Sequence, residues 1–531
     1  MRICKNLGGL ASVALTLAVA AGASADAKTF KWSYSGDVAT MDPQALRETF
    51  SREFVHNIME PLVSYDETMK IEPALAERWE LLSPEVWRFY LRQGVKFHNG
   101  ADFTADDVLF TFNRGRAETS PFRGNVNQIA DIKKVDDYTI DIVTKGPHPL
   151  LLRDLPGLLI FDEDWVRANN AADPVDPSKN QESYLTRHAM GTGPFILEEY
   201  TPDTRTVMKA NPNWWNDANK EHNLTEVIFT PIGSDATRVA ALLSGELDLI
   251  IPAPLQDLPR IDRADGAKVL EAPALRAVFL AMDVASPELR VSDVKGKNPL
   301  SDIRVRKALY QAIDVDTIVK RVMRGHAEVS SVIMSPFING YDKRLDGRFL
   351  PYDPDQSKKL LAEAGYPDGF EVGLDCPNDR YINDEEICVA VTAMWAKIGV
   401  NAKLTAQTKA NHFKKMLGGN SDIFMFGWAS ATTLDAYSFV KDIFHTPGDS
   451  FGNWNPGGYS NARIDELGSM IAVETEETKR NELLYEAFQI SKEEISHIPL
   501  HTQTVVWASR DNVEAVMTPI NVLFLKWVKV N

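Results

Sequence analysis

The sequence predicts a mixed α/β protein built from two or three domains. Helix and strand signals alternate along the whole chain, which argues against an all-helical or all-β fold. The chain has 531 residues, 44% of them hydrophobic, and this length is too great for a single hydrophobic core. Residues 423–427 form an apolar run that ends in glycine, as a buried central strand does.

The helix signals carry recognisable caps. Thr104 precedes an amphipathic segment, and Asp107 follows three residues later, as at a capped helix start. Ser234 precedes a second helical segment, which Gly245 ends before a strand over 247–251. Two further helices, each followed by a strand, are expected over 355–364 with 371–374 and over 384–398 with 400–405.

The first residues resemble an export signal. Arg2 and Lys5 give a basic start, 7–21 is apolar, and 23–25 reads Ala-Ser-Ala, a small-residue cleavage site. A membrane anchor is the alternative, but the apolar run is shorter than the ~20 residues needed to span a bilayer. We therefore expect a signal peptide over residues 1–25 and a mature chain that begins at Asp26.

The expected mature chain is strongly acidic. Removing residues 1–25 takes away two basic residues and no acidic one, so the net charge of −17 becomes −19. Such a surface disfavours nucleic acid and anionic membranes as partners. Cys4 lies before the cleavage site, so it cannot carry a lipid anchor. We expect a protein free in a periplasm.

Two cysteines remain in the mature chain, Cys376 and Cys388. In an oxidising compartment an isolated pair most simply forms a disulfide. A metal site is the alternative, but it needs further ligands, and the nearest histidine, His412, does not have the spacing of a zinc motif. The sequence thus predicts a disulfide and no metal site.

Catalytic motifs are absent. The sequence has no G-x-S-x-G elbow, no H-E-x-x-H and no P-loop lysine. Its ten histidines are scattered singly. The acidic pairs Asp106-Asp107 and Glu476-Glu477 lie in polar helical contexts, which solvated faces explain better than glycosidase carboxylates. We predict no catalytic residue and no cofactor.

Several blocks resemble one family, the extracytoplasmic solute-binding proteins of ABC importers in the peptide/nickel-binding cluster called family 5. They follow in the family's order over nearly the whole mature chain. The blocks lie at 75–114, 190–195, 211–215, 301–314 and 352–370.

This resemblance implies a two-lobed periplasmic binding protein fold of type II, cluster C. Lobe I would comprise residues 26–275, with an extra α/β subdomain at about 72–185, and lobe II residues 276–499. Residues 500–531 would return to lobe I. The lobes would close over a solute and dock on a membrane permease driven by a separate ATPase.

The resemblance also implies that the loop after a lobe II strand ending in Gly427-Trp428 contributes to the pocket. Trp428 offers a flat apolar face and one N–H donor, although it could instead cap a core. Dipeptide-binding members carry an aspartate three residues further on, where this chain has Ala431, followed by Thr432. Either Asp435 substitutes for that acid, or the solute has no free amine at this point.

Arg380 lies between the two cysteines, where dipeptide-binding relatives place an arginine for the carboxylate of the solute. The alternative is that Arg380 pairs with Asp379, Asp384 or Glu385. Tyr381 beside it could supply a ring or a hydroxyl group.

Four further contact candidates lie elsewhere in the chain. Thr40 and Met41 resemble the exit of the family's first strand, where Asp42 would form a turn before a proline. His445 and Trp454 lie in a later loop. For these last two the sequence favours loop packing over a contact with the solute.

We therefore predict a monomeric substrate-binding protein that delivers a short peptide or peptide-like compound to an ABC importer. One alternative keeps the fold and changes the solute to an opine, an oligosaccharide, or a metal or haem chelate. Another is a secreted hydrolase or an extracytoplasmic chaperone.

Overall fold

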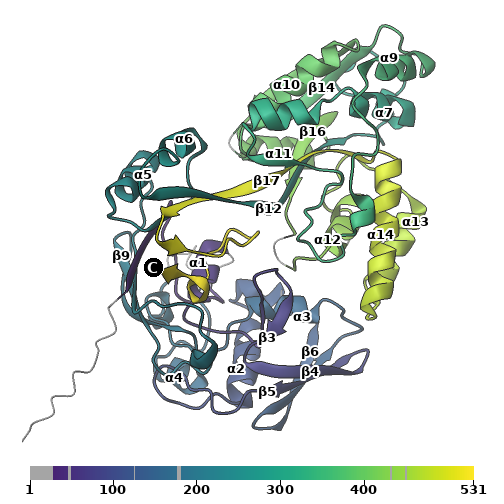
Figure 1. The fold of residues 1–531 in the computed structure, drawn as a ribbon. Helices are drawn as coiled ribbons and strands as arrows, with labels where there is room; N and C mark the ends of the chain where they lie inside the picture. Colours follow the sequence, from purple (N-terminus) through teal and green to yellow (C-terminus); the bar gives the residue numbers. More distant parts are fainter. Residues whose placement is uncertain are drawn as a thin grey trace, which may run out of the picture.

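Two long antiparallel strands, β12 (Ala267–Met282) and β17 (His497–Arg510), connect the two halves of the molecule (Figure 1). Their pairing shifts register between Pro273 and Ala277, so the strands bend where one half passes into the other. The structure is a computed structural model. It describes residues 28–45, 49–124, 126–175, 181–378, 380–430, 433–448 and 451–531. The predicted signal peptide lies outside these residues.

The first half, called lobe I here, is built on one end of an eleven-stranded sheet. Its central strand β1 (Thr29–Tyr34) pairs in parallel with β10 (Glu226–Phe229) and β11 (Leu249–Ile251). The antiparallel strands β9 (Arg205–Ala210) and β8 (Phe195–Thr201) complete this end, on the left in Figure 1. The sheet is held by an aromatic core in which the Trp32 ring lies 4.7 Å from Phe229 and 6.0 Å from Phe54.

The predicted cap of the helix that follows β10 is confirmed. The Ser234 side chain accepts the backbone N–H of Thr237 at the start of α5 (Asp235–Ser244). Gly245 ends the helix with φ of 81°, a conformation that glycine adopts without strain.

A second sheet forms a separate α/β unit within lobe I, at the bottom of Figure 1. The order is β4 (Ala76–Ser83), β5 (Val86–Leu91), β7 (Thr139–Thr144), β6 (Ile129–Asp136). Helix α2 (Ala105–Gly115) packs against it, because Val108 and Phe112 on one face are buried among sheet residues. The predicted cap is confirmed, since Thr104 and Asp107 form a reciprocal capping box.

The second half, called lobe II here, contains three parallel strands. They are β15 (Val400–Gln407), β14 (Phe370–Pro377) and β16 (Ile423–Trp428), and β12 pairs with β16 in antiparallel fashion. Side chains of β12 alternate between two cores. Val278 and Leu280 pack with α7 (Ile303–Gln311), α9 (Pro354–Glu363) and α10 (Asp384–Ala396), whereas Phe279 and Ala281 pack with α13 (Ala462–Ile471) and α14 (Glu477–Glu493). The predicted buried strand at 423–427 is therefore confirmed.

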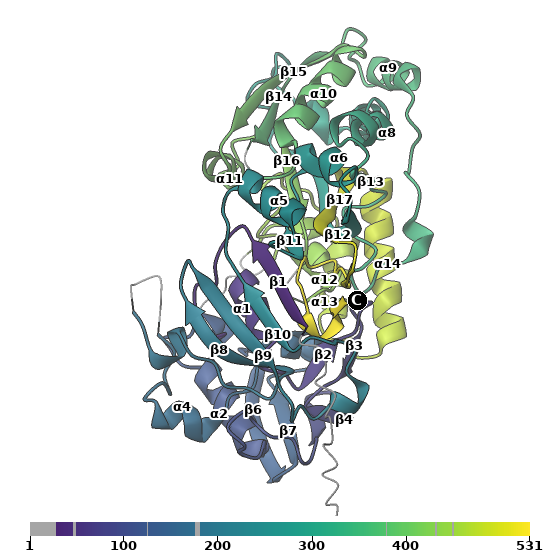
Figure 2. The same cartoon turned by 60° about the vertical axis from the view of Figure 1, so that its left-hand side comes forward.

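Shorter elements connect these layers, as Figure 2 shows from a second side. No helix in the described part of the chain has the length and apolar character needed to cross a membrane. The shorter elements are α1 (Thr49–Val55), β2 (Val63–Tyr65), β3 (Ile71–Pro73), α3 (Leu151–Asp154), α4 (Glu163–Ala168), α6 (Leu258–Ile261), α8 (Val315–Thr317), β13 (Ala327–Val329), α11 (Lys409–Leu417), α12 (Tyr437–Phe439), β18 (Val513–Glu514) and β19 (Lys529–Val530).

Candidate functional site

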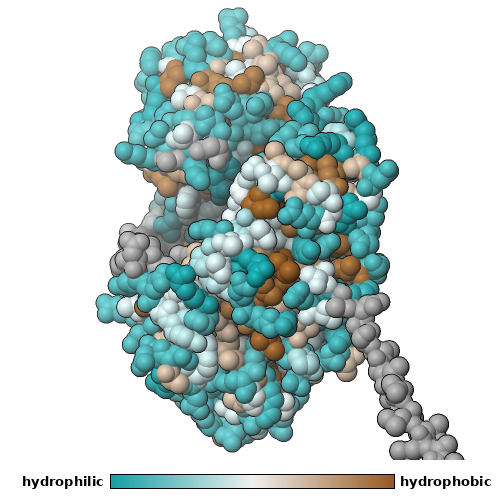
Figure 3. Space-filling model, turned by 90° about the vertical axis from the view of Figure 1, so that its left-hand side faces the viewer, coloured by the Kyte–Doolittle hydropathy of each residue, from teal (hydrophilic) through white to brown (hydrophobic). Residues whose placement is uncertain are grey.

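A cavity of about 1150 Å³ lies between the α/β unit of lobe I and lobe II. Lobe I contributes Gln128 and residues 147–150, which precede α3. Lobe II contributes the end of β16 and the loop that follows it. Figure 3 shows a mostly hydrophilic surface that narrows between the two lobes. The cavity is thus placed where movement of one lobe against the other changes its shape.

Aromatic rings form one wall of this cavity. Trp428 and Trp454 lie with their ring centroids 5.6 Å apart, and Phe426 stacks on Trp454 at the same distance. Phe413 from α11 closes the group edge-on at 6.3 Å from Trp454. All four residues line the cavity, so they offer flat apolar surface to a solute.

The indole of Trp428 has a more restricted role than its chemistry suggests. Its Nε1 donates to Ser438 Oγ at 3.0 Å, and this hydroxyl also contacts Ser430 Oγ at 2.9 Å. The single N–H donor is therefore used within lobe II. Only the ring face of Trp428 remains to meet a solute.

Gly427 precedes this tryptophan and allows a close approach of two other side chains. A Cβ atom at this position would lie 2.8 Å from the Tyr381 ring and 3.3 Å from Cδ of Arg276. Any larger residue would push these side chains away from β16. The Gly-Trp pair thus reflects two separate needs, space at the first residue and a ring at the second.

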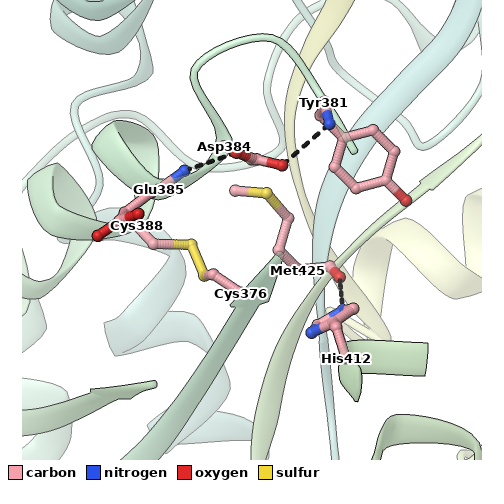
Figure 4. The surroundings of a disulfide bond; sticks show 7 residues. All are labelled: Cys376, Tyr381, Asp384, Glu385, Cys388, His412 and Met425. Carbon is pink, nitrogen blue, oxygen red and sulfur yellow. Dashed lines mark hydrogen bonds between the residues drawn. A yellow bond between two sulfur atoms is a disulfide. The ribbon is translucent and has the colours of Figure 1, made fainter. Parts of the chain in front are cut away.

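The predicted disulfide is present between Cys376 at the end of β14 and Cys388 in α10 (Figure 4). Both cysteines are fully buried. The loop that they close holds Tyr381 and Asp384, drawn beside the disulfide in the same figure. The disulfide therefore fixes the base of the loop that carries Arg380.

Arg380 lines the cavity, and Asp384, one of its three predicted alternative partners, is committed to backbone groups. Asp384 accepts the backbone N–H groups of Arg380 and Tyr381, each at 2.9 Å, and that of Glu385 at 3.0 Å. Among the described residues, no acid lies within ion-pair distance of the Arg380 guanidinium. Asp379, the third alternative, lies outside these residues.

Asp435 occupies a buried structural position. Its carboxylate accepts two hydrogen bonds from Arg480, at 2.8 and 2.7 Å, and others from Asn339 Nδ2 at 2.8 Å and the Tyr437 backbone at 2.9 Å. Arg153 of lobe I approaches it at 3.9 Å. With no exposed surface, this carboxylate faces protein groups and does not line the cavity.

Most of the other residues predicted to contact the solute are packed within the protein. Thr40 and Met41 are buried, and Met41 belongs to the core of lobe I. The His445 ring stacks on Phe451 at 4.3 Å, and it is Phe451 that lines the cavity. Tyr381 is buried behind Gly427. Ala431 and Thr432 lie outside the described residues.

Asp42, expected to form a turn, also has a second role. Its carboxylate caps the turn by accepting the Gln44 N–H at 3.0 Å. The same carboxylate binds Arg114 of α2 through two hydrogen bonds, at 3.0 and 2.5 Å. Both side chains are fully buried, so the pair fastens the α/β unit to the rest of lobe I.

Sequence reasoning missed Arg276, which lines the cavity from the bend in β12. Burial and the nearby Arg380 lower the pKa of its guanidinium. No motif marks this position, because it follows from the crossing of two long strands. Asp442 also lines the cavity, and burial raises the pKa of its carboxyl group. In the described part of the chain no cluster of His, Cys, Asp or Glu side chains could hold a metal ion.

Comparison with known proteins gives consistent matches along the chain. The family model "Bacterial extracellular solute-binding proteins, family 5 Middle" matches residues 70–451. The Dipeptide-binding protein of Escherichia coli (strain K12) is 27% identical over 548 residues, covering 98% of each chain. Heme-binding protein A of Haemophilus influenzae is 28% identical over 454 residues, covering 81% of this chain and 78% of that protein.

Solved structures show the same architecture. HbpA2 from Haemophilus parasuis has a TM-score of 0.82 at 24% identity and covers 95% of this chain and 100% of its own. The periplasmic murein tripeptide binding protein MppA, in its unliganded open form, has a TM-score of 0.81 at 20% identity, with 95% and 98% covered. DppA from Helicobacter pylori in complex with peptide STSA has 0.67 at 24% identity, with 94% and 98% covered. The predicted two-lobed α/β fold is confirmed.

Proposed function

The chain belongs to the bacterial extracellular solute-binding proteins of family 5, and we propose that it captures a short peptide or peptide-like solute for an ABC importer. The solute is held between the two lobes and passed to permease subunits in the membrane. Relatives with this role include the Dipeptide-binding protein of Escherichia coli and the Glutathione-binding protein GsiB of Salmonella typhimurium.

The cavity between the lobes is the observation that carries this proposal. Its volume of about 1150 Å³ is slightly above the range of about 300–1,000 Å³ that is typical of small-molecule pockets, which leaves room for a molecule of a few residues. Both lobes line it, so a bound solute gains contacts when they close. The aromatic wall fits solutes of variable side chain, because a flat ring does not demand one particular partner.

We assign roles to four of the predicted residues, three that meet the solute and one behind them. Trp428 and Trp454 form the wall, and Arg380 binds an acidic group of the solute through its planar guanidinium. Tyr381 supports Arg380 from behind, at 5.4 Å from its ring centroid to the guanidinium carbon. We assign no solute contact to Asp435, Thr40, Met41 or His445, because each is committed to packing or to a protein partner.

A non-peptide solute is a second candidate. Heme-binding protein A of Haemophilus influenzae matches this chain about as well as Di/tripeptide-binding protein 3 of Pseudomonas aeruginosa does. The acid closest to the position of the family's amine-binding aspartate, Asp435, is already paired with Arg480. A solute without a free amine therefore fits the cavity as well as a free peptide does.

The remaining features of the proposal follow from the sequence and the family. We propose that residues 1–25 are removed on export and that the chain works in the periplasm as a monomer, without lipid anchor or catalytic turnover. We also propose lobe I as residues 26–275, with an inserted unit at about 72–185, lobe II as 276–499, and a C-terminal return over 500–531. The bend of β12 at 273–277 agrees with this division.

Native mass spectrometry on the freshly purified full chain tests the proposal. We expect a bound mass of a few hundred daltons that denaturation releases, and a thermal-shift screen of peptides, opines and sugars should then reproduce its binding. A protein that carries no solute and is stabilised by no compound in the screen would contradict a solute-binding role.

A further inference from the structure

Arg276 lies in the part of β12 that joins the two lobes. It belongs to the short segment between Pro273 and Ala277 where the pairing of β12 with β17 shifts register. Residues before this segment pair within lobe I and those after it pair with β16 of lobe II. A group bound to Arg276 therefore contacts the strand segment that joins the two lobes.

Arg276 and Arg380 approach each other around one ring. Their guanidinium carbons lie 5.9 and 5.4 Å from the centroid of Tyr381. Gly427 makes this arrangement possible, because a Cβ there would meet both the ring and the Arg276 side chain. Two cations thus lie near one ring at the cavity.

Among the described residues, no acidic side chain forms an ion pair with Arg276 or Arg380. Nε of Arg276 is buried without a hydrogen-bond acceptor among them. Burial and the charge of Arg380 lower the pKa of Arg276, because both disfavour the charged form of its guanidinium. Arg276 is half-buried and Arg380 is exposed, so a bound anion would compensate above all the partly desolvated charge of Arg276.

The other charges on the cavity wall also favour a negatively charged solute. Besides the two arginines, its described residues include Lys441 and one acid, Asp442. The wall therefore carries excess positive charge in a protein whose net charge is −17. Such a local reversal of sign selects an anion.

We propose that Arg276 and Arg380 together bind the acid end of a solute that carries two negative charges there, as two carboxylates or as a phosphoryl group. The inference rests on the proposed function and narrows its substrate class. It adds Arg276 as a binding residue. It also makes the negative charge at the acid end the property by which the protein recognises its solute. One carboxylate satisfies one guanidinium fork, and the second charge is needed for the other.

Three blocked dipeptides of equal length test the inference on the full mature chain. N-acetyl-Ala-Glu has two carboxylates, N-acetyl-Ala-Gln has one, and N-acetyl-Ala-phosphoserine amide carries only a phosphoryl group. We expect at least one of the two dianions to bind wild type between about ten- and a hundredfold more tightly than N-acetyl-Ala-Gln, as charge-assisted hydrogen bonds require. Which dianion binds better distinguishes paired carboxylates from phosphate.

Substitutions then show whether Arg276 is responsible. Arg276→Gln should reduce the preference for the dianion over N-acetyl-Ala-Gln to less than tenfold, the difference that a single hydrogen bond makes. Arg276→Lys should keep part of this preference. Lys397→Gln removes an exposed charge from lobe II outside the cavity and should leave the preference unchanged. Circular dichroism and melting temperature check that each variant is folded.

The outcomes separate the two levels of the proposal. Dianions that bind wild type no better than N-acetyl-Ala-Gln, including no binding of any of the three, overturn the inference. A preference that survives Arg276→Gln, or that Lys397→Gln removes equally, overturns it too. Native mass spectrometry that finds a bound neutral solute overturns the inference and leaves the solute-binding role intact. Only the absence of any solute in that experiment and in the screen counts against the role itself.

Discussion

Arg480 holds the carboxylate of Asp435 with both terminal guanidinium nitrogens, at 2.8 and 2.7 Å, and neither side chain is exposed by more than 5%. The arginine comes from α14, and the aspartate follows the cavity loop after β16. The pair therefore ties this loop to a helix on the outside of lobe II. It stabilises the shape of the cavity wall without facing the solute.

Replacing Asp435 should reveal this structural role. Asp435→Asn is expected to lower the free energy of unfolding by about 3–5 kcal/mol, because it leaves Arg480 buried without its countercharge. Urea denaturation measures the loss. Asp442→Asn is the matched control on the cavity wall, where a raised pKa shows that ionisation is already unfavourable, so its stability should change by less than about 1 kcal/mol. Equal stability of the two variants would contradict the role.

Blocking the amine of a bound peptide should matter little. For any dipeptide that the thermal-shift screen identifies, we expect N-acetylation to change the affinity by less than about tenfold, or 1.4 kcal/mol. The reason is that Asp435 is occupied by Arg480 and does not line the cavity. Calorimetric titration of the free and acetylated forms measures the ratio. A loss above a hundredfold would show that an acid binds the ammonium group after all.

Truncating the aromatic wall should separate binding from folding. A solute at a hundred times its Kd stabilises wild type by about 2.7 kcal/mol, and Trp428→Ala is expected to remove most of this shift because the ring is half-buried at the cavity. Trp395→Ala is the contrasting variant. Its ring is fully buried in lobe II, so it should lose about 3–5 kcal/mol of stability. A full ligand-induced shift in Trp428→Ala would exclude this wall.

The sequence predicts the parts of this molecule that depend on neighbouring residues. Thr104 and Asp107 form their capping box within one turn, and the apolar run at 423–427 forms β16. The pairing of Asp435 with Arg480 spans 45 positions, and nothing local in either segment indicates it. Arg276 is likewise one basic residue in a strand, and only the bend in β12 turns it toward the cavity. Contacts between distant segments are what sequence patterns leave open.

Acid should weaken the molecule through a histidine at the bend of β17. Both ring nitrogens of His501 are buried without a partner in the described residues, and burial lowers its pKa to about 4 from 6.5. Because the folded pKa is depressed, its contribution is fully present above pH 6.5 and is lost as pH falls through 4. The loss amounts to about 3 kcal/mol over this window.

His501→Phe should flatten the fall in unfolding free energy between pH 6.5 and 4, as followed by urea denaturation at a series of pH values. The exposed His188 provides the control, since His188→Gln should leave the pH profile of wild type in place. Identical profiles for wild type and His501→Phe would contradict the assignment.

Removing the disulfide should affect stability and solute affinity separately. The double variant Cys376→Ala, Cys388→Ala opens a loop of 12 positions, and the chain-entropy model predicts a loss of about 3 kcal/mol. The same loop carries Arg380, whose backbone is held by Asp384. Affinity for an acidic solute should therefore fall even where the variant is fully folded, because the guanidinium is no longer fixed. Titration well below the unfolding midpoint measures this second effect.

Wild type treated with a reducing agent should behave as the double variant does. Unchanged affinity in both would show that Asp384 alone holds Arg380 in place.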